Sequence, residues 1–305
     1  MRHPRKVTIV EVGPRDGLQN EAASISTADK IAFVDKLSAA GPQVIEVSAF
    51  VSPTWVPQMA DASEVFAGIT RRAGVRYSAL VPNLAGLDRA YGAGVSEVGI
   101  FAAASETFSL KNSNQTIEAS LDNYRAVCAR AAELGIRVRG YVSTAFGCPF
   151  EGTIQPDKVA DVAAALINMG AFEVAVSDTI GIAHPGQVPD IVEAVAARIP
   201  LSSIALHFHD TRGMALANVL VALELGIATF DASAGGLGGC PYAPGATGNL
   251  GTEDLVYMLD GLDIETGVSL EALIAASTFI GSRVGHALPS RYCRAVTAQR
   301  PGQPG

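Results

Sequence analysis

The chain has 305 residues, of which 49% are hydrophobic and 17% are charged, so it carries enough apolar side chains for a sizeable core and is neither disordered nor fibrous. Its net charge of −8 excludes the basic character that nucleic acid or an anionic membrane selects in a partner. The four cysteines include no C-x-x-C pair, and no stretch has the pattern of a targeting or membrane-spanning segment, which predicts a cytoplasmic location.

Short β-branched runs recur along the chain and predict eight strands. They are residues 7–12, 44–47, 75–81, 96–101, 136–142, 172–177, 203–208 and 227–232. Five of these runs follow an apolar, Ala- or Leu-containing helical stretch that ends in a glycine, at Gly41, Gly94, Gly135, Gly170 and Gly226. Because glycine adopts positive φ at low cost, it ends a helix, and a strand that begins within a few residues of it is typical of an α/β unit.

The helices between the strands also have start signals. Ser26 and Asp29 have the spacing of a capping box, and residues 153–156 precede the apolar helical face of Val159, Val162 and Leu166. Eight such units predict a single (β/α)8 TIM barrel over residues 5–290, followed by a flexible tail over 291–305. The alternative is a doubly wound open sheet, but its first turn normally has a Gly-rich nucleotide-binding sequence, and the turn here is GPRDGLQN.

In a barrel of this kind, reactive groups gather at the carboxyl ends of the strands. His207 and His209 lie two residues apart in the seventh predicted strand, so both imidazoles point to the same side. Asp16, which follows the first strand, would complete a two-histidine, one-carboxylate set that suits Mg²⁺, Mn²⁺, Fe²⁺ or Zn²⁺. The alternative is that each histidine is a hydrogen-bonded residue of the core.

Three further residues are candidates for catalysis. Arg15 beside Asp16 is either a surface ion pair or a fixed positive group for a developing enolate oxygen. Glu46 lies in an apolar strand, where an unpaired charge is costly, so we expect it to support Arg15 or the metal region. Cys240 lies in a Gly- and Pro-rich loop after the eighth strand, where it either donates a proton or is a harmless thiol of a surface loop.

Several longer motifs resemble the 3-hydroxy-3-methylglutaryl-CoA (HMG-CoA) lyase family, which belongs to a metal-dependent superfamily of lyases and Claisen-type synthases with this barrel. The resemblance covers about residues 6–285, and the loop around Cys240 is its most specific part. The motifs are EVGPRDGLQNE (11–21), FVSPTWVPQM (50–59), RGYVSTAFGCPFEG (139–152), SDTIG (177–181), HFHDTRGMALAN (207–218) and GGLGGCPYAPGATGNLGTEDLVYML (235–259).

This resemblance implies a ligand set for a divalent metal, Mg²⁺ or Mn²⁺. The positions that match the family's metal ligands are Asp16, His207, His209 and Asn249. Asn249 is a candidate through the resemblance alone, whereas the other three also follow from their places at strand ends. The implied reaction is a retro-Claisen cleavage of HMG-CoA, or of a close 3-hydroxy-3-alkylglutaryl-CoA, to acetyl-CoA and a 3-oxo acid such as acetoacetate. Leucine catabolism and ketone body formation are the implied setting.

The resemblance also implies roles for other residues. Arg15 matches the arginine that holds the thioester carbonyl, and Cys240 matches the cysteine that transfers a proton. The further active-site acids would be Glu46 and Glu253, and the candidate contacts of the acyl-CoA substrate would be Lys111 and Asn112. A homodimer is the family expectation for assembly.

Two alternative functions and two departures from the family accompany this interpretation. The alternatives are a Claisen-type acyl-CoA synthase of the same superfamily and a non-catalytic metal-binding barrel. The departures are Arg212, which replaces a frequent tyrosine, and the stretch 47–49, which has fewer hydroxyl groups than usual. We expect both near the acyl pocket, so the preferred acyl chain stays open.

Overall fold

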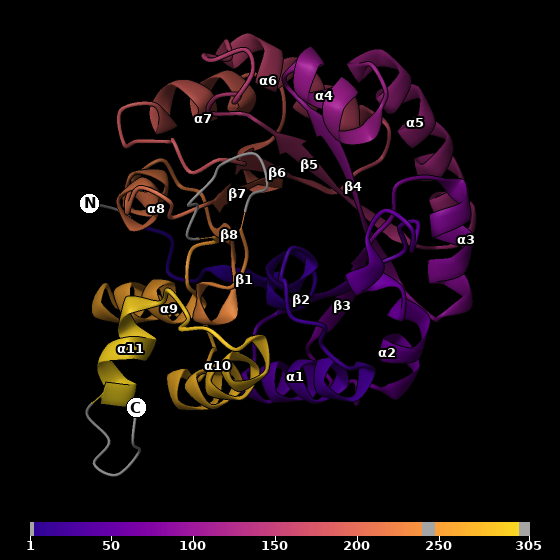
Figure 1. The fold of residues 1–305 in the computed structure, drawn as a ribbon. Coiled ribbons are helices and arrows are strands. Elements are labelled where there is room, and N and C mark those ends of the chain that lie inside the picture. Colours follow the sequence, from indigo (N-terminus) through magenta and orange to yellow (C-terminus); the bar gives the residue numbers. More distant parts are fainter. Residues whose placement is uncertain (1–2, 240–247, 299–305) are drawn as a thin grey trace.

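The computed structural model describes residues 3–239 and 248–298, and it contains a closed barrel of eight parallel strands (Figure 1). The strands are β1 (Thr8–Glu11), β2 (Val44–Ala49), β3 (Arg76–Leu80), β4 (Glu97–Ala103), β5 (Arg137–Ser143), β6 (Glu173–Asp178), β7 (Ile204–Phe208) and β8 (Thr229–Ala232). Each strand pairs with the next along the chain, and β8 pairs with β1 from Thr8 opposite Thr229 to Glu11 opposite Ala232. The predicted barrel fold is therefore confirmed.

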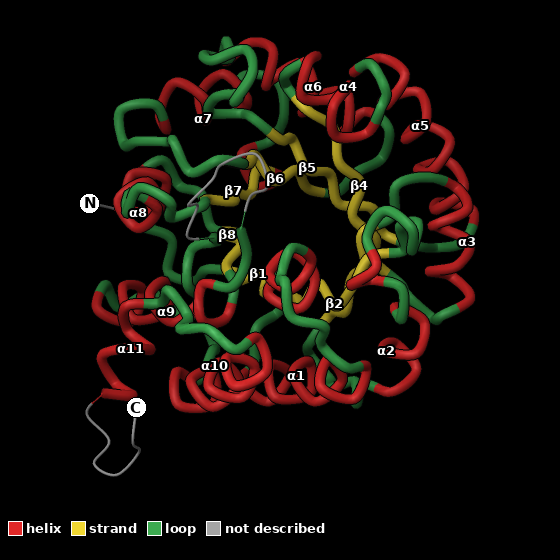
Figure 2. Tube along the Cα trace, viewed as in Figure 1, coloured by secondary structure: helices red, strands yellow, loops and turns green. Residues whose placement is uncertain are grey.

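Helices form a ring around the outside of the barrel, as Figure 2 shows. They are α1 (Thr27–Ala40), α2 (Ala62–Gly68), α3 (Leu84–Gly92), α4 (Glu106–Ser113), α5 (Ile117–Glu133), α6 (Pro156–Asn168), α7 (Val188–Ala196), α8 (Ala215–Glu224), α9 (Thr252–Gly261), α10 (Leu270–Val284) and α11 (Arg291–Ala298). Within the described part of the chain, no helix is both long enough and apolar enough to cross a membrane.

The local signals in the sequence act as expected at the helix ends. The Ser26 hydroxyl accepts a hydrogen bond from the backbone N–H of Asp29 at 3.1 Å, which confirms the predicted cap of α1. Helix α1 ends at Gly41, whose φ of 93° is left-handed. The other four predicted helix-ending glycines also have positive φ. These helix ends set short connections to the strands that follow, as between the end of α1 at Ala40 and the start of β2 at Val44.

Apolar side chains fill the space between the barrel and its helices, whereas the inside of the barrel holds charged groups. Fully buried residues of the outer layer include Phe33 and Leu37 of α1 and Leu166 of α6. Hydrogen bonds join Tyr141 on β5 to Glu46 on β2, which are not neighbouring strands, so these side chains meet across the barrel interior. A barrel interior is usually packed with branched aliphatic residues, so buried charges here indicate a specific role.

The C-terminal region differs from our prediction of a flexible tail over residues 291–305, because residues 291–298 form helix α11. The Asp254 carboxylate of α9 accepts hydrogen bonds from the backbone N–H groups of Arg291 at 3.2 Å and Tyr292 at 2.7 Å. The Tyr292 ring also stacks on Tyr257 of α9, with 4.8 Å between centroids. The prediction was wrong here because a distant residue caps this helix, and a local sequence pattern does not reveal such a cap.

Candidate active site

The first element of the site is a five-residue π-helical turn, Gly13–Gly17, that follows β1. Three consecutive backbone N–H groups, those of Arg15, Asp16 and Gly17, all approach the carbonyl oxygen of Val12 within 3.2 Å. A Cβ atom on Gly17 would come within 2.9 Å of Leu237 Cβ, so glycine is needed for close contact with the loop after β8. The tight turn places the side chains of residues 15 and 16 at the mouth of the barrel.

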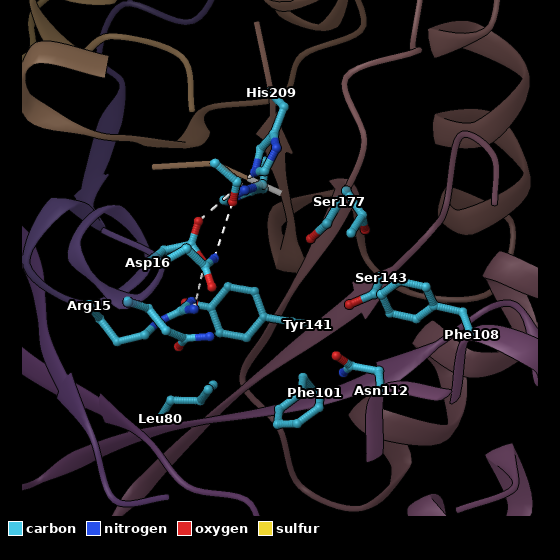
Figure 3. A pocket seen from close by; sticks show the side chains of 15 residues that line it. Arg15, Asp16, Leu80, Phe101, Phe108, Asn112, Tyr141, Ser143, Ser177 and His209 are labelled. Atoms are coloured by element: carbon cyan, nitrogen blue, oxygen red, sulfur yellow. Dashed lines mark hydrogen bonds and ion pairs between the residues drawn. The ribbon is translucent and has the colours of Figure 1, made fainter. Parts of the chain in front are cut away.

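Asp16, His207 and His209 come together at this mouth. Each of the three offers one ligand atom, and these atoms lie within 4.8 Å of one another. The two imidazole centroids are 5.1 Å apart, as expected for side chains two residues apart on a strand. His209 Nε2 lies 3.9 Å from an Asp16 carboxylate oxygen (Figure 3). The side chains predicted to hold a divalent metal are therefore brought together by the fold.

Asn249, in the loop after β8, also contacts this group. Its side-chain nitrogen donates hydrogen bonds to Asp16 at 2.9 Å and to the Leu237 carbonyl at 3.0 Å. Its side-chain oxygen is buried and has no hydrogen-bond partner among residues 3–239 and 248–298. A buried polar atom without a partner costs free energy, and an amide oxygen is a suitable ligand for a hard cation. The residues present therefore fit a divalent cation bound by oxygen and nitrogen atoms.

The charges of the group also suit a cation. Burial is the largest influence on the pKa of Asp16 and would raise it, but the charge of Arg15, the two histidines and the Asn249 hydrogen bond together outweigh burial. The net pKa is well below its usual range, so the carboxylate is ionised. Burial and the neighbouring His207 lower the pKa of His209 to about 4. His209 is therefore a neutral imidazole at pH 7, which is the form that binds metal ions.

Arg15 is fixed by two carboxylates. Its Nε donates to Glu46 at 2.6 Å and its Nη1 donates to Asp16 at 2.6 Å. Burial acts to lower the pKa of Arg15, but the charges of these two acids overcome it and raise the pKa above its usual value. Of the two expected neighbours of Glu46, Arg15 and the metal region, the structure shows direct contact with Arg15. Because a guanidinium has five N–H donors, others remain for a ligand.

A buried hydrogen-bond network continues from Glu46 across the barrel. The Tyr141 hydroxyl donates to Glu46 at 3.1 Å and accepts from Arg139 Nη1 at 2.9 Å. Arg139 also donates two hydrogen bonds to the Asp231 carboxylate, at 2.8 and 3.1 Å. One of these two carboxylate oxygens, Asp231 Oδ2, also lies 3.2 Å from His207 Nδ1. The network therefore connects the arginine of the site with one histidine of the metal cluster.

Arg139, Tyr141 and Asp231 were missed when candidates were chosen from the sequence. Arg139 and Asp231 lie inside β-branched runs, where a charged residue is costly, and this is the signal that identified Glu46. Both are almost fully buried in the structure. Applying the same criterion to every predicted strand would have found them.

The mouth of the barrel holds a cavity of about 180 Å³, whose charged and polar lining includes Arg15, Asp16, Tyr141, His207 and His209 (Figure 3). The apolar residues of its lining include Leu80, Phe101 and Phe108, and Asn112 also lines it. A second cavity of about 420 Å³ shares Leu80, Phe101 and Asn112 with the first and extends to the exposed ring of Trp55. The site thus has a charged end beside an apolar end that continues outward.

Two of the other predicted site residues lie away from this cavity. Glu253 is fully buried beneath the loop after β8, where its carboxylate accepts hydrogen bonds from the Gly235 backbone N–H and the Ser277 hydroxyl. Lys111 is exposed, and its Nζ lies 4.0 Å from the centroid of the Phe150 ring. Cys240 lies outside the described residues.

The two departures from the family pattern are not part of the cavity, in contrast to our expectation. Arg212 donates to the carbonyl oxygens of Ile180 and Gly181, which draws its side chain away from the acyl site. Ser48 is buried against Met59, with its hydroxyl 3.4 Å from the sulfur atom. Both lie near the site in sequence, but local hydrogen bonds and strand direction turn them elsewhere.

A (β/α)8 barrel with an Asp-His-His cluster and a buried arginine at the carboxyl ends of its strands is the architecture of a metal-dependent barrel enzyme. The family model described as HMGL-like matches residues 6–280, and the chain belongs to this family. The chain is a carbon–carbon lyase, as the following similarities to characterised relatives show.

Two relatives illustrate the similarity in sequence. The chain is 52% identical to the 3-hydroxy-3-isohexenylglutaryl-CoA/hydroxy-methylglutaryl-CoA lyase of Pseudomonas aeruginosa over 299 residues, which cover 98% of this chain and 100% of the relative. It is also 52% identical to the mitochondrial hydroxymethylglutaryl-CoA lyase of Homo sapiens over 293 residues, which cover 96% of this chain and 90% of the human protein.

Solved structures agree with these relatives. The hydroxymethylglutaryl-CoA lyase of Pseudomonas aeruginosa superposes with a TM-score of 0.97 at 52% identity, covering 98% of this chain and all of the other. An HMG-CoA lyase from Acinetobacter baumannii, in complex with coenzyme A and 3-methylmalate, superposes with a TM-score of 0.91 at 40% identity, covering 99% and 97%. The predicted family and class of reaction are therefore confirmed.

Proposed function

We propose that this chain cleaves HMG-CoA, or a close 3-hydroxy-3-alkylglutaryl-CoA, to acetyl-CoA and a 3-oxo acid such as acetoacetate. The observation that carries the proposal is the convergence of Asp16, His207 and His209 beside Arg15 in one cavity. The names of relatives at 52% identity and a neighbour in complex with coenzyme A and 3-methylmalate support this choice of substrate.

The residues that would hold a divalent cation, Mg²⁺ or Mn²⁺, are Asp16, His207, His209 and Asn249. The unpartnered side-chain oxygen of Asn249 supports its inclusion. When bound, the cation supplies Lewis-acid polarisation of the substrate oxygens. A hard cation such as Mg²⁺ takes about six ligands, so a set of four protein ligands would leave positions for substrate oxygens, as catalytic rather than structural sites require.

Different residues of the chain accept the substrate proton and stabilise the negative charge that develops. A carboxylate or imidazole of the cluster accepts the proton of the substrate 3-hydroxyl, and the bond between the second and third acyl carbons breaks as that oxygen becomes a ketone. The electron pair of the broken bond forms an acetyl-CoA enolate. Arg15, held rigid by Glu46 and Asp16, stabilises the negative charge on the thioester oxygen by on the order of 3 kcal/mol.

Cys240 completes the reaction by donating its thiol proton to the enolate carbon. A thiol has an ordinary pKa near 8.5, so at neutral pH it is mostly protonated and able to act as an acid. Its thiolate regains a proton from solvent before the next turnover. Glu253 has an indirect role in this scheme and does not touch the substrate. Its carboxylate holds Gly235, at the start of the loop that leads to Cys240.

The two connected cavities suggest a path for the substrate. The acyl group occupies the smaller cavity, and the CoA arm passes Asn112 and leaves through the larger cavity, which reaches the exposed ring of Trp55. Lys111, one residue before Asn112 and exposed, is placed to meet the charged end of CoA near the surface. We further propose that residues 5–290 form the catalytic unit, that the protein acts as a homodimer, and that it works in the cytoplasm.

Acetoacetate release from HMG-CoA, measured in a coupled assay, tests the function. We expect turnover with HMG-CoA, its loss after dialysis against a chelator, and its return with Mg²⁺ or Mn²⁺. Analogues with longer 3-alkyl branches would define the preferred chain. Metal binding without product release would instead support a non-catalytic barrel, and product formed only from acetyl-CoA and an oxo acid would support a synthase.

A further inference from the structure

We infer that Asp231, together with Arg139 and Tyr141, positions two parts of the active site relative to each other. One part is His207 of the metal cluster, and the other is Arg15. The inference rests on the proposed function, because it treats His207 as a metal ligand and Arg15 as the group that stabilises the enolate. None of the three residues was a candidate from the sequence. They are positioning residues, because they act through His207 and Arg15.

The first step concerns the tautomer of His207. Asp231 receives two hydrogen bonds from the Arg139 guanidinium, at 2.8 and 3.1 Å, and its side chain is fully buried. A carboxylate in such a two-point ion pair is ionised and accepts hydrogen bonds only. His207 Nδ1, 3.2 Å from Asp231 Oδ2, must therefore carry the proton in this contact. The lone pair of His207 is then on Nε2, as metal binding requires.

The second step concerns the orientation of Asp231 itself. Arg139 is nearly buried and has carboxylates on two sides, since its Nε donates to Glu173 at 2.7 Å while its two terminal nitrogens hold Asp231. The Arg139 guanidinium is planar and rigid, so the hydrogen bond from Nε to Glu173 also fixes the direction in which Nη1 and Nη2 point. Asp231, and through it the His207 ring, therefore has one preferred orientation even before a cation binds.

The third step connects the metal ligand to the arginine of the site. Arg139 Nη1 also donates to the Tyr141 hydroxyl at 2.9 Å, and that hydroxyl donates to Glu46 at 3.1 Å. Glu46 in turn accepts from Arg15 Nε at 2.6 Å. The hydrogen bonds run from β8 through β5 to β2 and end at the turn after β1. The two ends of the site are thus held by one buried chain of contacts across the barrel.

The decisive variant is Asp231→Asn, measured by calorimetric titration of the metal-free full-length protein with Mn²⁺. The asparagine keeps the size of the side chain but loses the charge that holds both Arg139 and the His207 N–H. We expect Mn²⁺ affinity to fall by roughly 10- to 100-fold, the usual effect of removing a partner that orients a metal ligand. An affinity within about twofold of wild type, with the fold intact, would overturn the inference.

The matched control is Glu97→Gln. Glu97 is another nearly buried carboxylate of a barrel strand, and it pairs with Arg76 at 3.4 Å and Arg137 at 3.3 Å. Its charge acts on Arg139, but its ion pairs are with those two arginines and not with the residues that join His207 to Arg15. It should alter thermal stability without altering Mn²⁺ affinity. Equal losses of affinity in both variants would show a general effect of removing buried charge and would also overturn the inference.

Tyr141→Phe tests the connection to Arg15. The ring stays, but the hydroxyl that joins Arg139 to Glu46 is removed. We expect Mn²⁺ affinity within about twofold of wild type and a fall in kcat of at least tenfold with little change in KM. An unchanged kcat would remove Tyr141 from the positioning role. If the wild-type protein itself bound no Mn²⁺ or released no product, the proposed function would fail instead, so the two failures are distinguishable.

Discussion

The side chains of Asn249 and Asp16, which are 233 residues apart in sequence, are joined by a hydrogen bond of 2.9 Å from the Asn249 amide to the Asp16 carboxylate. The other oxygen of that carboxylate accepts from Arg15 at 2.6 Å. Each carboxylate oxygen therefore has one fixed donor, and Asp16 has little freedom to turn. The contact ties the turn after β1 to the loop after β8, so the first and last parts of the barrel build one site.

This contact predicts that Asn249→Ala weakens metal binding. The change removes both the donor that orients Asp16 and the unpartnered oxygen proposed as a ligand. We expect Mn²⁺ affinity to fall by at least about tenfold in a calorimetric titration. Asn218→Ala is the control, because Asn218 is equally buried but its amide donates to the Ala183 carbonyl. A loss of affinity in the control as large as in the test variant would contradict the prediction.

A second prediction concerns Arg15→Lys. Lysine keeps the positive charge between Glu46 and Asp16, so the fold should survive, but a point charge cannot bind both acids and a ligand in the way a planar guanidinium does. We expect kcat to fall by on the order of 10²- to 10³-fold, which is typical for the loss of one group that stabilises an oxyanion. Mn²⁺ affinity should change by only a few fold. Steady-state kinetics with a kcat within threefold of wild type would contradict this role.

A third prediction concerns Cys240→Ala. If the thiol protonates the enolate carbon, its removal should lower turnover by roughly two or more orders of magnitude, the usual contribution of a general acid. Metal content, measured by atomic emission after loading with Mn²⁺, should be unchanged because the thiol is not among the proposed ligands. Near-normal turnover in this variant would exclude the cysteine from the reaction.

The sequence revealed much of this site because its residues follow a simple rule of the barrel. Arg15, Asp16, His207 and His209 are polar residues at the ends of apolar strands, and the closed sheet brings strand ends together. Eight β-branched runs, several preceded by glycine, were enough to locate the strands. At these positions, the local sequence pattern was therefore enough to predict which side chains the barrel brings together.

Other parts depended on contacts that no local pattern encodes. The partners of Arg139 lie on a neighbouring strand and on one across the barrel, so its role is set by the closure of the sheet. Asn249 is one amide in a glycine-rich loop, and its backbone bridge to His209 and its hydrogen bond to Asp16 place it at the site. Helix α11 depends on a cap from Asp254, 37 residues earlier. In each case the physical cause is long-range.

A fourth prediction uses the buried acid Glu253. Burial, only partly offset by the Ser277 and Gly235 hydrogen bonds, raises its pKa from 4.5 to about 7. Between these values the folded protein binds more protons at this group than the unfolded chain does. The group therefore lowers the free energy of unfolding as pH rises from about 4.5 to 7, and the loss is complete above pH 7.

Glu253→Gln removes this effect while keeping a carbonyl to accept from Gly235. The melting temperature of the metal-free variant, relative to wild type, should therefore increase from pH 5 to about pH 7 and then level off towards pH 8, as scanning fluorimetry can measure. The control is Glu265→Gln, an exposed acid that pairs with Lys6 at the surface, and its difference from wild type should be nearly flat with pH. A flat difference for Glu253→Gln would show that its pKa is close to that of a free carboxyl group.

The last prediction tests how tightly the interior of the barrel is packed around Tyr141 and Glu46. A Cβ atom on Gly99 of β4 would come within 2.9 Å of the Tyr141 ring and 3.3 Å of a Glu46 carboxylate oxygen. Because both side chains are held by hydrogen bonds, neither can move without breaking a contact. We expect Gly99→Ala to destabilise the protein by about 1–3 kcal/mol, the usual cost of overpacking a core.

The same variant should also lower kcat, because a displaced Glu46 would no longer hold Arg15 in place. The matched control is Gly92→Ala at the end of α3, where an added Cβ would have no atom within 4 Å in the described structure. Alanine there should leave kcat unchanged and keep or slightly raise stability, since it restricts the unfolded chain. Urea unfolding and steady-state kinetics on both variants decide the matter, and equal behaviour of the two would show that the interior tolerates an extra methyl group beside Tyr141.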